Sequence, residues 1–117
     1  MSRIKRGVTS RAKHKKLLKL TKGYRATKSK LVKVAREAAL HAGQYAYHGR
    51  KLRKRNIRRE WIVRISEATK SYGLPYNRFI SGLKQANITL DRKILADMVV
   101  NDPETFKSIV DRVQKTS

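Results

Sequence analysis

A dense run of basic residues is the part of this sequence with the clearest chemical meaning. Seven of the ten residues from 50 to 59 carry positive charge: Arg50, Lys51, Arg53, Lys54, Arg55, Arg58 and Arg59. On a helix, with about 3.6 residues per turn, these side chains surround most of the axis and leave a gap only at Leu52 and Asn56. An ordinary surface helix has one polar side and one apolar side. Because like charges at helical spacing repel one another, the run predicts a helix that is surrounded by phosphates.

RNA fits this distribution of charge better than DNA does. A DNA-reading helix needs its charge on the side that faces the groove, whereas structured RNA can enclose a helix and present phosphates and 2′-hydroxyls from several directions. Four rings, those of Tyr24, Tyr45, Tyr47 and His48, lie near the charges. Each of them either stacks on an unpaired base or packs against the rest of the chain. The residues that we expect to bind RNA, these four rings included, are Arg3, Lys5, Arg6, Arg11, Lys13, His14, Lys15, Lys16, Lys22, Tyr24, Arg25, Lys28, Lys30, Lys33, Arg36, Tyr45, Tyr47, His48, Arg50, Lys51, Arg53, Lys54, Arg55, Arg58 and Arg59.

The charge of the whole chain supports a polyanionic partner. Its 117 residues include 30 Lys plus Arg and 8 Asp plus Glu, for a formal net charge of +22. Residues 1–60 hold 21 of the basic residues and 2 of the acidic ones, and residues 61–117 hold the others. Such asymmetry between the halves of a chain is typical of a nucleic-acid-binding extension that is joined to a less charged domain.

Several other classes of protein are disfavoured. The chain has no Cys, which excludes disulfides and Cys-based zinc sites. His14, His41 and His48 lack the spacing and the carboxylate of a zincin-like site, and no phosphate-binding glycine loop occurs. We therefore expect no enzyme activity, no cofactor and no metal site. No apolar run approaches the roughly 20 residues of a membrane span, so we expect no membrane partner.

The first residues, "MSRIKRGVTSRAKHKK", do not resemble a secretory signal, because they contain no apolar region. A basic, acid-poor start also resembles an organelle transit peptide. That alternative is disfavoured because the basic character continues to Arg59 instead of stopping early.

The elements that must position these side chains are predicted to be helices. In "SRAKHKKLLKL" we expect a short basic helix that Ser10 caps and that Gly23 ends. From Ala26 to Tyr72 there is no Pro, and apolar residues recur at helical spacing. This stretch predicts one helix of roughly 60–70 Å, bent near Gly43 or Gly49.

The rest of the chain predicts short helices around a small core. Gly73 suits the position after the long helix, and Pro75 suits the first turn of the next one, which Asn87 can end. Asp91 and Asp102 suit the caps of two further helices. The expected core residues are Trp61, Ile65, Phe79, Leu83, Ile94, Met98, Phe106 and Ile109.

The predicted fold class is therefore all-α, with a long basic helical N-terminal extension that continues into a small C-terminal helical domain. We assign residues 1–58 to the extension, which we expect to be labile without RNA because it has charge but no core. Residues 59–117 are assigned to the compact C-terminal domain.

Three stretches of the chain resemble the bacterial large-subunit ribosomal protein L20 family: "KRGVTSRAKHKKLLKLTKGYR", "AGQYAYHGRKLRKRNIRREWIVRI" and "RFISGLKQANITLDRKILADM". Together with the segments between them they cover nearly the whole chain. The resemblance implies a structural constituent of the ribosome, located in the cytoplasm, that binds large-subunit ribosomal RNA, lies beside other large-subunit proteins and supports early subunit assembly. Some members of the family also repress translation of their own operon through the C-terminal domain, which makes the messenger RNA of this chain a candidate partner.

Two other functions compete with this one. A DNA-compacting, histone-like protein would have similar charge but would follow DNA in fractionation and would resist RNase. A dedicated messenger-RNA repressor would use the C-terminal surface without joining the large subunit.

Overall fold

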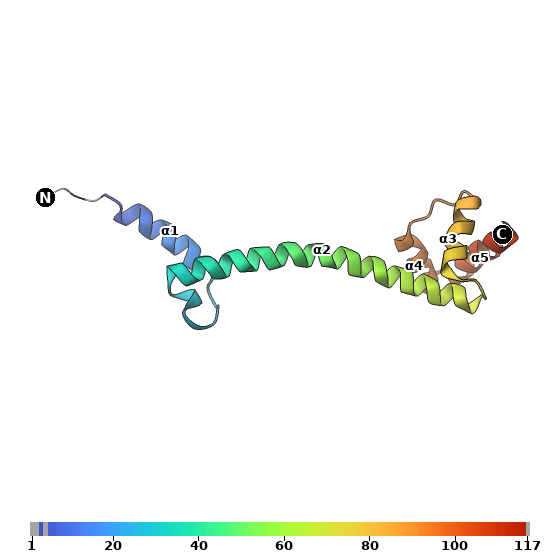
Figure 1. Cartoon of the computed structure of the whole chain (residues 1–117), viewed down its shortest axis with the longest axis horizontal. Coiled ribbons are helices and arrows are strands. Elements are labelled where there is room, and N and C mark those ends of the chain that lie inside the picture. The colour runs from blue at the N-terminus through green and yellow to red at the C-terminus, as the bar shows by residue number, and fades with distance from the viewer. Residues whose placement is uncertain (1–2, 4, 117) are drawn as a thin grey trace. The chain divides into compact units, whose positions relative to one another are not determined.

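The computed structural model of the chain describes residues 3 and 5–116, and every regular element in this part of the chain is a helix (Figure 1). The α-helices are α1 (Gly7–Leu20), α2 (Val32–Ser71), α3 (Tyr76–Gln85), α4 (Arg92–Asn101) and α5 (Pro103–Thr116), with a short 3₁₀ helix, η1, at Ala26–Ser29. The predicted all-α class with one long helix is confirmed. Within the described residues, no helix is both long and apolar enough to cross a membrane.

The long helix α2 contains 40 residues and continues without a break through Gly43 and Gly49. It begins later than predicted, because Ala26 has a positive φ of 56°, which lies outside the range of an α-helix. The chain instead makes the 3₁₀ turn of η1 before α2 starts at Val32. Ser10 does not cap α1 as predicted. Its backbone N–H already donates to the carbonyl of Arg6 at 2.9 Å, so Ser10 lies inside the helix.

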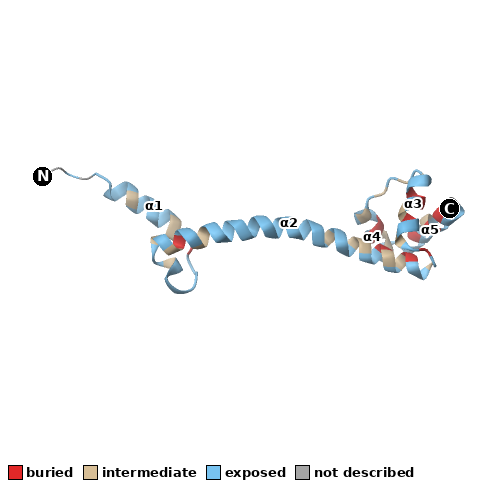
Figure 2. Ribbon diagram, in the orientation of Figure 1, coloured by how far each residue is buried: buried red, intermediate tan, exposed pale blue. Residues whose placement is uncertain are grey.

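The chain divides into two compact units, residues 1–51 and residues 52–117, and the division falls inside α2. In the described part of the first unit, only Thr21 and Ala35 are fully buried hydrophobic or polar side chains. Most of this unit is exposed (Figure 2). Our expectation that residues 59–117 fold alone concerns their stability in isolation, and it stays a prediction.

The second unit has a core of nine buried residues. Helix α5 packs against both α3 and α4. Within the core, the centre of the Phe79 ring on α3 lies 5.7 Å from the centre of the Phe106 ring on α5. The buried set is Ile65, Leu74, Phe79, Leu83, Leu95, Ala96, Phe106, Val110 and Val113. It thus draws on the C-terminal part of α2 as well as on the three short helices.

The predicted core residues lie in or against this core with one exception. Trp61, Met98 and Ile109 are half-buried and pack against the buried set. Ile94 is 43% exposed, whereas its neighbour Leu95 is fully buried. Adjacent residues point about 100° apart on a helix, and the contacts of α4 with α5 turn Leu95 inward. The core residue at this point of α4 is therefore Leu95, and the choice of Ile94 is corrected.

Two left-handed residues end helices in the second unit. After α2, Gly73 (φ 73°) donates its N–H to the carbonyl of Lys70 at 2.9 Å, and Leu74 donates to Thr69 at 3.0 Å. This is the hydrogen-bond pattern of a Schellman motif, as predicted for Gly73. Asn87 (φ 53°) ends α3 in the same way.

The N-terminal ends of the short helices agree less well with the predicted capping residues than the C-terminal ends do. Pro75 precedes α3 in an extended conformation instead of lying in its first turn. Asp91 precedes α4 without a side-chain hydrogen bond to the helix. Asp102 caps α5 as predicted, because its carboxylate accepts from both the backbone N–H and the hydroxyl of Thr105, at 3.2 and 2.6 Å.

Candidate nucleic-acid interface

The central part of α2 projects its side chains into solvent on all sides. From residue 40 to residue 60 every side chain is exposed except that of Ile57, which is half-buried. All seven basic residues of the run from 50 to 59 are among the exposed ones (Figure 2). No segment that the structure describes covers this stretch, so its charges can meet phosphates around the helix.

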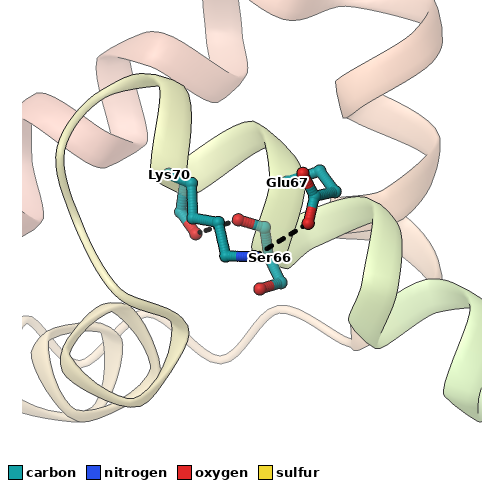
Figure 3. A network of polar contacts seen from close by, with 4 residues as sticks. Ser66, Glu67 and Lys70 are labelled. Carbon is teal, nitrogen blue, oxygen red and sulfur yellow. Dashed lines mark hydrogen bonds and ion pairs between the residues drawn. The ribbon is translucent and has the colours of Figure 1, made fainter.

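The charges of the run have no acidic partners among the residues that the structure describes. An ion pair joins Lys70 and Glu67 at 2.9 Å, near the end of α2 (Figure 3). Both of its side chains are more than half exposed, and a pair of this kind contributes little to stability. Among residues 3 and 5–116, no carboxylate lies within ion-pair distance of the basic residues between Arg3 and Arg59. Their charge is left for an external polyanion.

All of the residues that we expect to bind RNA are exposed. They lie just before α1, along α1, along the connection from residue 21 to residue 31, and along α2. The structure therefore leaves every one of these side chains accessible, but it does not gather them into one compact patch.

Three of the expected stacking residues, Tyr45, Tyr47 and His48, take part in aromatic contacts on α2. The rings of His41 and Tyr45 are 6.0 Å apart and nearly parallel, at 26°. Tyr47 meets His48 edge-on at 5.7 Å, and the ammonium group of Lys51 lies 5.4 Å from the centre of the Tyr47 ring. Tyr45 and Tyr47 are 70% and 54% exposed, so both rings present apolar faces to solvent instead of packing in a core.

One end of this aromatic stretch borders a cleft of about 510 Å³ in the first unit. The residues that line it come from the segment before α2 and from its first half: Tyr24, Lys28, Val34, Glu37, Ala38, His41, Ala42 and Tyr45. Two of the polar residues in this lining, Glu37 and His41, were not among the predicted site residues. Their spacing was a usable signal, because residues 37, 41 and 45 recur every four positions and so share one face of a helix.

The second unit has a smaller hollow of about 320 Å³ beside Trp61. Arg64, Lys93 and the exposed side chain of Ile94 also line it. Among the described residues, no three His, Asp or Glu side chains come together as a metal site would require. The hydrogen bonds from Thr105 hold the pKa of Asp102 below its ordinary value of 3.8, and this group belongs to a helix cap and not to a reaction centre.

Comparison with known proteins identifies similar chains that belong to the ribosome, which agrees with the polyanionic partner that the charge of this chain indicates. The family model described as ribosomal protein L20 matches residues 3–109. A protein of Roseiflexus sp. (strain RS-1) is 54% identical over 115 residues, and one of Leptothrix cholodnii is 53% identical over 114. The alignments cover 98% and 97%, respectively, of both chains. Each of these relatives is named large ribosomal subunit protein bL20.

Proposed function

The chain belongs to the ribosomal protein L20 family, and on this premise we propose that it binds large-subunit ribosomal RNA directly and supports early assembly of the large subunit. Membership of the family makes it a structural, non-enzymatic constituent of the large ribosomal subunit in the cytoplasm, where it associates with ribosomal RNA and other ribosomal proteins. The proposal adds the direct contact, the residues that make it and the stage at which it acts.

The observation that carries this proposal is the bare, uncompensated charge of α2. Residues 50–59 hold seven basic side chains, all exposed and none paired with a carboxylate within the described part of the chain. These like charges repel one another in the free protein. The repulsion falls when phosphates surround the helix, because RNA then supplies the missing negative charge.

Arginine predominates in the run, and its chemistry suits the role. The guanidinium group presents two parallel N–H groups that fork onto a phosphate, whereas the ammonium group of lysine acts as a point charge. Five of the seven basic residues are Arg. Contacts of this kind fix the position of a protein on folded RNA without reading its sequence, as is appropriate for a protein that holds RNA segments together during assembly.

We also propose that residues 1–58 are ordered mainly by the RNA, whereas residues 59–117 fold by themselves. The nine-residue core lies wholly in the second segment, while the first has little buried surface with which to offset the entropy of ordering. RNA would supply that missing stabilisation as the subunit assembles.

A second candidate function is binding of the chain's own messenger RNA by the C-terminal domain. The hollow beside Trp61 favours it, because Arg64 and Lys93 flank a half-buried ring there. If this surface binds RNA, an Arg64→Gln/Lys93→Gln variant loses affinity for the leader of its own operon. It keeps affinity for ribosomal RNA that the extension contacts. Equal affinity of the variant and the wild type for the leader RNA would exclude this function.

The main proposal is tested with the variant Arg53→Gln/Arg55→Gln/Arg59→Gln. Gln has a helix propensity close to that of Arg, so α2 should still form. We expect large-subunit precursors to accumulate in cells that depend on this variant. The thermal unfolding of the second unit, followed by the fluorescence of Trp61, should hardly change, because none of the three side chains enters the core.

The control variant removes the same charge from another surface. Arg78, Lys84 and Lys107 are exposed on α3 and α5, and their replacement by Gln should leave assembly normal. If the two triple variants assembled subunits equally well, the run would serve solubility alone and the proposal would be wrong. Unfolding of the second unit by the first variant would show instead that the run is structural.

A further inference from the structure

We propose that the cleft of the first unit binds one unpaired guanine base of the RNA, and that the carboxylate of Glu37 accepts hydrogen bonds from the Watson–Crick edge of that base. This inference rests on the proposed function, because it assigns one site to the RNA that the extension contacts. The cleft, about 510 Å³, lies in the size range of pockets that hold small ligands, so a nucleobase fits within it.

Glu37 is unexpected in its surroundings. It is the only acidic residue among residues 1–59, which contain 21 Lys and Arg. A carboxylate on an RNA-binding surface repels phosphates, so it weakens binding unless it meets a group that donates hydrogen bonds.

The protein itself gives Glu37 no such group. Within residues 3 and 5–116, its carboxylate takes part in no ion pair or side-chain hydrogen bond, although Lys33 and His41 lie one turn away on either side. It also lies beyond the first turn of α2, which starts at Val32, and the interaction of a carboxylate with the helix dipole fades after that turn. The carboxylate is exposed and available to a ligand.

The rest of the cleft provides what a base requires. His41 and Tyr45 follow Glu37 at successive turns of the same helix face, and their nearly parallel rings offer a stacking surface. Tyr24, which is 37% exposed, contributes a third ring from the segment before α2. Unpaired bases of RNA are bound in this way, by stacking on aromatic rings and by hydrogen bonds to their edges.

The hydrogen-bonding pattern selects guanine. An ionised carboxylate has two oxygens and only accepts. Guanine presents two adjacent donors on its Watson–Crick edge, N1–H and the 2-amino group, and the two carboxylate oxygens can accept both. Adenine, cytosine and uracil each place an acceptor beside their donor on that edge, so each would turn a lone pair toward one carboxylate oxygen. Lys28, which also lines the cleft, can pair with the phosphate of the bound nucleotide.

The test uses the full-length protein and fluorescent single-stranded RNA octamers that hold one variable base in a uridine background. We expect the wild type to bind the octamer with guanine about tenfold more tightly than the octamer with adenine, in line with a bidentate contact between a side chain and a base. Inosine, which lacks the 2-amino group, should fall between the two.

The variant Glu37→Gln should lose this preference, because an amide offers one acceptor where the carboxylate has two. If the negative charge of Glu37 only repelled RNA, its removal should strengthen binding to every octamer. Weaker binding of the variant to the guanine octamer would therefore show a lost hydrogen-bond contact and not an effect of charge. Glu60→Gln is the matched control, because it makes the same change of charge at an exposed residue outside the cleft. It should keep the guanine preference.

A second measurement separates the base site from general RNA binding. Kethoxal modifies N1 and the 2-amino group of accessible guanines, so a guanine of large-subunit RNA that occupies the cleft should be protected by the wild type and by Glu60→Gln, but not by Glu37→Gln. If the wild type shows no preference among the octamers, or if Glu37→Gln keeps both the preference and the protection, the inference is wrong. The proposed function would survive that result, because it requires RNA binding and a role in assembly but no preference for one base. In these two assays it would fail only if the wild type did not bind RNA.

Discussion

Helices α3 and α5 of the second unit approach closely at Gly82, and this contact allows a quantitative prediction. A Cβ atom added to Gly82 of α3 would overlap Cγ1 of Val113 on α5 and would lie 3.4 Å from the Cβ atom of Val113. Both residues are buried, and Val113 is fully so. The absence of a side chain at residue 82 is therefore what permits α5 to pack this closely against α3.

Two opposing effects set the result of Gly82→Ala. Alanine is better than glycine inside a helix by about 1 kcal/mol. The new methyl group overpacks the interface, which typically costs about 1–3 kcal/mol, and Val113 cannot move aside easily because β-branched residues in helices have one preferred rotamer. We therefore expect a net loss of roughly 0–2 kcal/mol in the free energy of unfolding of this unit. The melting temperature would then fall by up to about 8–16 °C.

Urea and thermal unfolding of the full-length protein measure this effect through Trp61, which is the only tryptophan of the chain and packs against the core. Ser81→Ala is the matched control, because residue 81 lies beside Gly82 in α3 but is exposed. It should stabilise the unit by a few tenths of a kcal/mol through helix propensity alone.

A double-mutant cycle with Val113→Ala shows how much of the effect of Gly82→Ala comes from close packing against Val113 and how much from helix propensity. Val113→Ala alone should cost about 2–3 kcal/mol, since it deletes two buried methyl groups and leaves a cavity. In that background the overlap is gone, so Gly82→Ala should now stabilise by about 1 kcal/mol. The coupling between the two sites should be roughly 1–3 kcal/mol. If Gly82→Ala were stabilising in the wild type and additive with Val113→Ala, the helices would not meet as the structure has them.

Three further predictions concern the charge, the extension and the cap of α5. The affinity for large-subunit RNA should fall by roughly 10³–10⁵ between 50 and 200 mM salt if 6–10 phosphates are neutralised, by analogy with duplex DNA; a nearly flat titration, or full affinity in a fragment without residues 1–58, would contradict this. In the free protein, hydrogen exchange should be fast across residues 1–58 and slow in the core of the second unit; strong, uniform protection of residues 1–58 in a monomer would overturn the proposed division. Asp102→Ala should lower the melting temperature at pH 7, because it removes both hydrogen bonds with Thr105. Since the pKa of Asp102 is depressed in the folded state, its contribution is complete above the ordinary pKa of 3.8 and is lost as the pH falls through the lower folded value. The difference in melting temperature between Asp102→Ala and the wild type should therefore disappear in acid, and a difference that persisted below this range would refute the assigned role of the carboxylate.

The sequence by itself determined the features that depend on local backbone preference and on total charge. Gly73 and the Asp102–Pro103 pair marked helix ends correctly, because left-handed φ values, fixed proline φ values and short acceptor side chains act within one turn of the chain. The absence of proline from 26–72 and its good helix formers indicated the long helix. The asymmetry of charge indicated a polyanionic partner before any fold was known.

Tertiary structure decided which apolar and polar side chains became buried. The sequence offers Ile94 and Leu95 side by side, and only the packing of α4 against α5 selects Leu95 for the core. The burial of Thr69 has the same origin. Its hydroxyl donates to the carbonyl of Ser66 at 3.1 Å, so the buried hydroxyl keeps a hydrogen-bond partner.

The two features with the sharpest predictions could be seen only in three dimensions. The contact of Gly82 with Val113 joins residues 31 positions apart, and the cleft joins Tyr24 to Glu37 and Tyr45 across a turn and a 3₁₀ helix. Such approaches depend on where whole helices lie, whereas sequence periodicity reports only the side of a helix on which a residue falls. For this reason the sequence predicts RNA binding, whereas only the fold shows the cleft at which we propose that a base binds.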